Sequence, residues 1–160
     1  MAANQRRFWR ENWVERRAGV GGEGVVNRAC ALRAERASIR LAGRAENIGR
    51  AREFVTASLG AGHPCAGVLE LIVSELMTNS IVHSRSGQDG GMVTVALAGD
   101  GRRARVEVTD DGGPELPRLR AVDFGAESGR GLHLVDALAD VWGWGRGPGE
   151  TTISWAEVTA

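Results

Sequence analysis

The chain contains no lysine, and all twenty of its basic residues are arginine. The phosphate-binding loop of P-loop NTPases needs a lysine that reaches the phosphates, and the protein-kinase fold also needs its own lysine. Both kinds of nucleotide site are therefore excluded, as is Schiff-base catalysis through a lysine amine. We attribute the arginine bias itself to a GC-rich genome.

The sequence also lacks long apolar runs and patterned cysteines. No stretch approaches the about 20 apolar residues that a membrane span needs, and the N-terminus has no apolar core like that of a signal peptide. Cys30 and Cys65 have no motif spacing, which fits a reduced cytoplasm and indicates neither a metal site nor a disulfide framework. These absences predict a cytoplasmic protein with no membrane association.

Charge is balanced over the whole chain but not along it. Residues 1–37 carry eight arginines and four acidic residues, whereas residues 38–160 carry twelve arginines and sixteen acidic residues, a net charge of −4. The larger segment therefore lacks the basic patch of a nucleic-acid binder, and we expect no direct nucleic-acid partner.

The length and composition predict one domain at 38–160, preceded by an N-terminal extension at 1–37. In the extension, aromatic residues lie among charges and a glycine-rich segment at 19–24 interrupts any helix. We expect the extension to be flexible. A short amphipathic helix at 8–17 and a translation start placed too early remain alternatives.

Hydrophobic periodicity predicts the elements of the domain. They are a strand at 38–42, helices at 45–59 and 66–83, strands at 92–98 and 103–109 joined by a hairpin turn at 99–101, a helix at 131–142, and strands at 141–144 and 151–158. This order predicts an α/β (α+β) two-layer sandwich, in which a mixed, mostly antiparallel sheet carries helices on one face.

Three segments place polar residues or glycines where ligands bind. The first is one face of the helix at 66–83, where Glu75, Asn79 and His83 recur every four residues. This face continues that of Val68 and Leu71, which predicts that it lies on the buried side, where unpaired polar groups cost stability. A position at the solvent-facing edge is the alternative, and for His83 so is a structural role near the helix end.

The second segment begins where a predicted strand ends, with Asp110 followed two residues later by Gly112. An aspartate there can accept a hydrogen bond from an exocyclic amine, and glycine lets the backbone approach a ligand closely. A plain turn is the alternative, since Asp-Gly is a common turn pair. Residues 110–129 have no hydrophobic period, and a loop of this length is usually functional.

The third segment is Gly129, Arg130, Gly131 and Leu132, at the start of a predicted helix. Backbone N–H groups at a helix start form an anion site, and an arginine adds a charge-assisted contact to phosphate. Capping of the helix by Ser128 is the alternative.

The order and spacing of the three segments resemble the Bergerat-type ATP site of the superfamily that contains gyrase, histidine kinases and anti-sigma serine kinases. The matching residues are Glu75 and Asn79 in Glu-Leu-Met-Thr-Asn-Ser, Asp110 and Gly112 in Asp-Asp-Gly-Gly-Pro, Gly129 and Gly131 in Gly-Arg-Gly-Leu, and Thr151 or Thr152 in Gly-Glu-Thr-Thr-Ile. The resemblance covers about residues 38–158 and is most like the small anti-sigma kinases of actinobacteria.

This resemblance implies ATP and Mg²⁺ as cofactors. It implies that Glu75 is the catalytic general base, that Asn79 binds the metal, and that Asp110 recognises the adenine amine with help from Thr151 or its neighbour. The full set of implied cofactor-binding residues is Asn79, His83, Asp110, Gly112, Gly129, Arg130, Gly131, Leu132 and Thr151. The segment 115–128 would form the lid over ATP.

The expected function is that of an anti-sigma factor with serine/threonine kinase activity, which phosphorylates an anti-anti-sigma partner; such regulators are often dimeric. The alternative is a non-catalytic, ATP-dependent protein-binding module. A histidine-kinase fragment is disfavoured because no histidine lies in a helix upstream of the ATP site. Two departures from the family pattern, Pro114 in place of its last glycine and a short lid, predict weakened retention of nucleotide.

Overall fold

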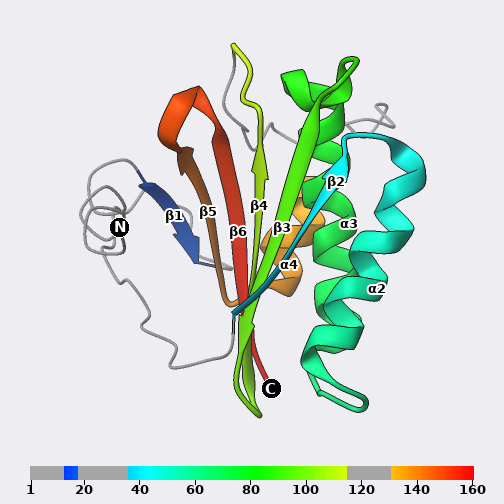
Figure 1. Ribbon diagram of the computed structural model, residues 1–160. Coiled ribbons are helices and arrows are strands. Elements are labelled where there is room, and N and C mark those ends of the chain that lie inside the picture. Colours follow the sequence, from blue (N-terminus) through cyan, green and yellow to red (C-terminus); the bar gives the residue numbers. More distant parts are fainter. Residues whose placement is uncertain (1–12, 18–35, 115–130) are drawn as a thin grey trace, which may run out of the picture.

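The computed structural model describes residues 13–17, 36–114 and 131–160, which form a sheet layer and a helix layer (Figure 1). The strands are β1 (Trp13–Arg17), β2 (Arg36–Ala42), β3 (Met92–Gly99), β4 (Arg103–Asp110), β5 (Val141–Arg146) and β6 (Thr152–Thr159). The helices are α2 (Ile48–Leu59), α3 (Ala66–His83) and α4 (Gly131–Leu138), with 3₁₀ turns at Ala45–Asn47, Arg85–Gly87 and Pro148–Glu150. Sheet order is β1-β5-β6-β4-β3-β2, and every pairing of these strands is antiparallel. The predicted fold class is confirmed.

The core lies between α3 and the inward side of the sheet. Leu69, Ile72, Val73, Leu76 and Met77 recur at helical spacing on α3 and are fully buried. They face the alternate residues of β3 and β4, whose burial follows the period of two of a half-covered sheet. In β4 this period brings position 110 to the inward face, so the strand delivers a carboxyl group to the end of the core.

Helix α4 ends earlier than the periodicity predicts. The helix expected over 131–142 stops at Leu138, and Trp142 lies in β5 with its Nε1 donating to Asp136 at 2.8 Å. The amide of Asp140 already donates to the carbonyl of Glu157 at 3.0 Å. Sheet hydrogen bonds to β6 therefore replace the helical ones, although the apolar spacing continues through Trp142.

Part of the N-terminal extension is a strand. Residues 13–17 form β1, which pairs with the edge of β5, so the helix considered over 8–17 is wrong for this portion. An edge strand presents unpaired backbone N–H and C=O groups, and pairing with β1 satisfies them whatever the local sequence period favours. The next strand, β2, begins at Arg36, two residues before the predicted start.

Strand β6 is buried on both faces. Its even-numbered residues face the helices. Ile153 and Trp155 lie on the other face, where they are 3% and 4% exposed, and they do not belong to the hydrophobic core between the sheet and the helices. The guanidinium of Arg105 on β4 lies 3.9 Å from the centre of the Trp155 ring. Within the part of the chain that the structure describes, no helix is long and apolar enough to cross a membrane.

Candidate functional site

The carboxyl group of Asp110 is buried at the end of β4 and is held by several hydrogen bonds. The amide of Gly112 donates to its Oδ1 at 2.7 Å, and Ser80 on α3 and Thr152 on β6 also hydrogen-bond to it. Burial raises the pKa of this carboxyl above its ordinary value, and the hydrogen bonds oppose that shift. A buried acceptor fixed in this way suits a ligand that presents an amine.

Of the two threonines considered, the structure brings Thr152 to Asp110. These residues are direct partners in the β4–β6 register, and the Thr152 side chain is buried. The hydroxyl of Thr151 instead donates to the carbonyl of Pro148 at 2.9 Å, within the β5–β6 turn. The difference arises because Thr151 precedes β6 and belongs to the turn, whereas Thr152 is the first residue of the strand and pairs with Asp110.

Gly112 is required at its position for two separate reasons. Its φ of +71° lies in the left-handed region, which disfavours residues with a Cβ. A Cβ there would also collide with the carbonyl oxygen of Glu150 in the β5–β6 turn. The loop after Asp110 is therefore in backbone contact with that turn.

We expect Gly112→Ala to destabilise the protein by about 2–4 kcal/mol, because it adds a steric collision to the cost of a positive φ. Gly90→Ala is the matched control, since Gly90 has a φ of +78° with open space around its Cβ position. Its expected cost is about 1 kcal/mol, from backbone strain alone. Urea unfolding of both variants measures the difference, and equal losses would contradict the collision.

The polar face of α3 lies at the boundary between core and solvent. Glu75 and Asn79 are half-buried and His83 is exposed, while Leu71, one turn before Glu75, is 50% exposed. The solvent-edge alternative therefore describes this face better than full burial does. His83 is the last residue of α3, and its backbone carbonyl lies against Gly113.

The start of α4 adjoins this face of α3. A Cβ on Gly131 would collide with the carboxylate of Glu75, so the first residue of α4 lies against that side chain. Leu132 follows and packs into the core at 9% exposure. The predicted phosphate-binding residues Gly129 and Arg130, and the lid at 115–128, lie outside the described residues.

Two residues of this site were not singled out from the sequence. Ser80 continues the apolar stripe of α3, four residues after Leu76, and a polar residue in a buried stripe was the available signal. Arg146, at the end of β5, donates to backbone carbonyls of both neighbouring turns. No sequence period marks it, because its role depends on turns that meet only in the fold.

The pKa shift of Asp110 predicts a pH-dependent effect of Asp110→Asn. A raised folded-state pKa means that the folded protein holds the proton more readily, so stability falls as pH rises from the ordinary value of 3.8 through the raised one. Removing the charge should therefore raise the melting temperature at about pH 7, with little change at about pH 3. Thermal unfolding measured by circular dichroism at both values tests this, and a lower melting temperature at neutral pH would contradict it.

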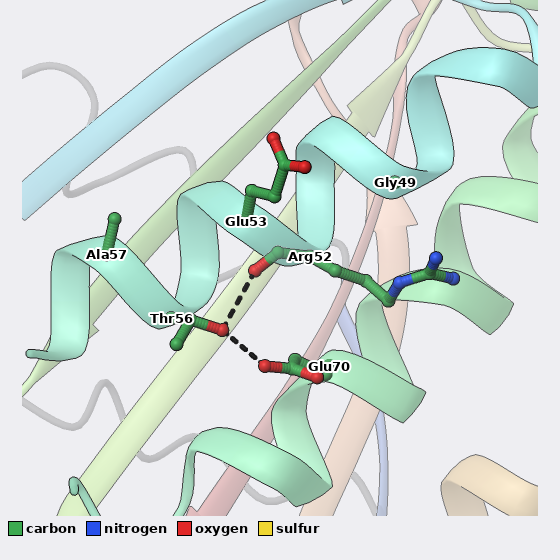
Figure 2. Close-up of a pocket in the computed structure, with 6 residues that line it drawn as sticks. All are labelled: Gly49, Arg52, Glu53, Thr56, Ala57 and Glu70. Carbon is green, nitrogen blue, oxygen red and sulfur yellow. Dashed lines mark hydrogen bonds between the residues drawn. The ribbon is translucent and has the colours of Figure 1, made fainter. Parts of the chain in front are cut away.

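A separate groove lies on the surface between α2 and α3 (Figure 2). Its lining is Gly49, Arg52, Glu53, Thr56, Ala57 and Glu70. The hydroxyl of Thr56 is within hydrogen-bond distance of Glu70 and of the Arg52 carbonyl, so these polar groups already have partners. The groove contains none of the residues predicted to bind ATP.

The model of the histidine kinase-like ATPase domain matches residues 41–155, and the chain belongs to this family. A comparison with the curated proteins gave no match. The family assignment supports ATP binding. It also confirms the superfamily that the three sequence segments resemble. The match does not distinguish the anti-sigma kinases from other members of that superfamily.

The described residues fit the two groups that such a domain takes. For adenine, Asp110 supplies a buried acceptor, and the N–H of Gly112 holds its carboxylate at 2.7 Å. For Mg²⁺, the described part of the chain holds no cluster of three or more His, Cys, Asp or Glu residues. Mg²⁺ bound to nucleotide takes most of its ligands from phosphates and water, so one protein oxygen, such as that of Asn79, suffices.

Proposed function

We propose that this protein is an anti-sigma factor that binds ATP and Mg²⁺ and phosphorylates a serine or threonine of an anti-anti-sigma partner. One observation carries the proposal, which is the contact between the Glu75 carboxylate and Gly131. Through it, the helix bearing Glu75 and Asn79 adjoins the N-terminus of α4. A helix N-terminus beside these residues is suited to binding phosphate, because its free N–H groups and dipole attract anions.

In the proposed complex, Asp110 accepts a hydrogen bond from the adenine amine and Thr152 holds the carboxylate in place. The amide oxygen of Asn79 binds Mg²⁺, which supplies charge neutralisation at the phosphates. Gly131, the first residue of α4, donates its backbone N–H to the phosphates. The absence of lysine is consistent with this site, because the metal, the backbone and a helix terminus carry the positive charge.

The proposed role of Glu75 is to position the hydroxyl of the partner. Phosphoryl transfer depends mainly on placement and charge neutralisation, so a carboxylate that accepts a hydrogen bond from the hydroxyl meets the need. A bond forms between the hydroxyl oxygen and the γ-phosphorus as the bond to the β–γ bridging oxygen breaks. The proton passes to Glu75 and ADP leaves.

A protein substrate suits the surface next to Glu75. Leu71 precedes Glu75 by one turn on the same face of α3 and is half exposed, so an apolar side chain faces solvent beside the catalytic candidate. A partner that buries Leu71 would bring its hydroxyl towards Glu75. The proposed partners are a sigma factor and an anti-anti-sigma protein. Because both act in transcription control, the proposed place of action is the cytoplasm.

A second candidate is a module that binds ATP and a partner without transferring phosphate, since binding and transfer use most of the same residues. Pro114, where the family pattern has a glycine, has no amide N–H to offer a nucleotide, so it bears on the retention of ATP in either function. Incubation with ATP labelled at the γ-phosphate and with candidate anti-anti-sigma proteins distinguishes the two. Label on a serine or threonine of a partner supports the kinase, whereas ATP binding without transfer to any partner supports the module.

A further inference from the structure

Three segments meet at one end of the sheet, beside Asp110. They are the loop after β4, the turn between β5 and β6, and the end of α3; the first two lie at the upper end of the sheet in Figure 1. The amide of Arg85, just after α3, donates to the carbonyl of Gly112 at 2.8 Å, and Gly113 lies against the carbonyl of His83. The loop that follows Asp110 is thus packed between two other turns.

Arg146 joins two of these segments through one guanidinium. Its Nη2 donates to the carbonyl of Gly113 at 2.9 Å, and its Nη1 donates to the carbonyl of Glu150 at 3.3 Å. In the sheet, Arg146 is the direct partner of Thr152, which in turn is the direct partner of Asp110. Arg146 therefore stands two strands away from Asp110 and holds the loop that leaves it.

The geometry at this end of the sheet depends on a fixed separation between the loop after β4 and the turn between β5 and β6. Glu150 has a φ of +63°, and its carbonyl oxygen points at the Cα of Gly112 so closely that no Cβ fits between them. A rigid, planar guanidinium sets the separation of two carbonyls better than a flexible amine does, because its N–H donors have fixed directions. The ion pair between Arg85 and Glu150 adds little, since its atoms are 3.8 Å apart and both side chains are exposed.

We propose that Arg146 is a positioning residue that sets both the affinity and the base selectivity of the nucleotide site; this rests on the proposed binding of ATP. Recognition of adenine requires the Asp110 carboxylate to keep a fixed position, and the loop fixes it through the N–H of Gly112 at 2.7 Å. Guanine presents a carbonyl where adenine presents its amine, so an Asp110 carboxylate held rigidly in this position excludes guanine. With Arg146 removed, the loop moves away from the turn and the pocket accepts either base more equally.

The test uses the full chain and compares Arg146→Met and Arg146→Lys with the wild type. Arg102→Met is the matched control, because Arg102 also donates from its guanidinium to a backbone carbonyl, that of Ala160, at the other end of the sheet. Calorimetric titrations with MgATP and with MgGTP give the affinity of each variant and the ratio between the bases. Circular dichroism verifies that each variant folds.

We expect Arg146→Met to lower the ATP affinity about tenfold and to reduce the preference for ATP over GTP. Arg146→Lys keeps one of the two hydrogen bonds, so its ATP affinity and base preference should lie between those of Arg146→Met and the wild type. Arg102→Met should match the wild type in both. Wild-type affinity and selectivity in Arg146→Met, or equal losses in Arg102→Met, would overturn the proposal. If Arg146→Met does not fold, wild-type affinity and selectivity in Arg146→Lys would overturn the proposal. A wild-type chain that does not bind ATP refutes the proposed function instead.

Discussion

Asp110→Asn is expected to lower the affinity for ATP by about a hundredfold, because it turns a buried acceptor into a group that presents an amide donor to the adenine amine. The substitution preserves the shape of the side chain. Its remaining oxygen can still accept from the amide of Gly112, so the loop keeps its hydrogen bond. Isothermal titration of the wild type and the variant with MgATP measures the change.

The control for this experiment is Asp111→Asn, one residue further along the same loop. The Asp111 carboxylate accepts from the backbone amide of Met92 at 2.8 Å, so it serves the loop and not the ligand. We expect it to bind ATP within about threefold of the wild type. Equal losses in both variants would show that the loop merely tolerates no such change, and unaltered binding in Asp110→Asn would exclude Asp110 from adenine recognition.

Glu75→Gln is expected to reduce phosphotransfer to the partner by at least about a hundredfold while ATP binding remains. The neutral amide cannot accept the proton of the attacking hydroxyl, yet it fills the same space beside Gly131. The removal of a negative charge near the phosphates should leave ATP affinity equal or higher. Transfer of γ-phosphate label, measured together with calorimetry on the same preparation, separates the two effects.

Glu70→Gln is the matched control for Glu75→Gln. Glu70 lies on the same helix and its carboxylate pairs with the hydroxyl of Thr56 in the groove between α2 and α3 (Figure 2). We expect its phosphotransfer rate to equal that of the wild type. Phosphotransfer retained in Glu75→Gln would rule out the proposed role of this carboxylate, whereas equal losses in both variants would indicate a general effect on α3.

The sequence predicts most elements of this fold because their local patterns agree with their tertiary surroundings. Helix α3 has the predicted bounds, since its apolar residues recur at a spacing that no strand can use. Strands β3 and β4 alternate clearly, and the hairpin between them follows from their turn residues. At β1 and at the end of α4, the local hydrophobic period disagrees with the tertiary surroundings. There the pairing of strands in the sheet decides the conformation.

The candidate site is only partly accessible from the sequence. Glu75, Asn79, Asp110 and Gly112 stand out because polar residues and glycines interrupt regular elements. Arg146 does not, since it acts through hydrogen bonds to turns that are distant in the chain, and the contacts of Ser80 and Thr152 with Asp110 likewise follow only from the fold. The choice between Thr151 and Thr152 depends on where β6 begins and on which residue pairs with Asp110, and only the β4–β6 register fixes that.

By itself, the sequence determined the fold class, the superfamily and the residue types of a nucleotide site without lysine, because periodicity and motif spacing are local properties of the chain. The tertiary structure alone decided that the Glu75 carboxylate meets the first residue of α4, and that a guanidinium from β5 ties down the loop after β4. These contacts join residues many positions apart. They depend on how the strands pair and on how the helices pack across the sheet, which no local pattern specifies.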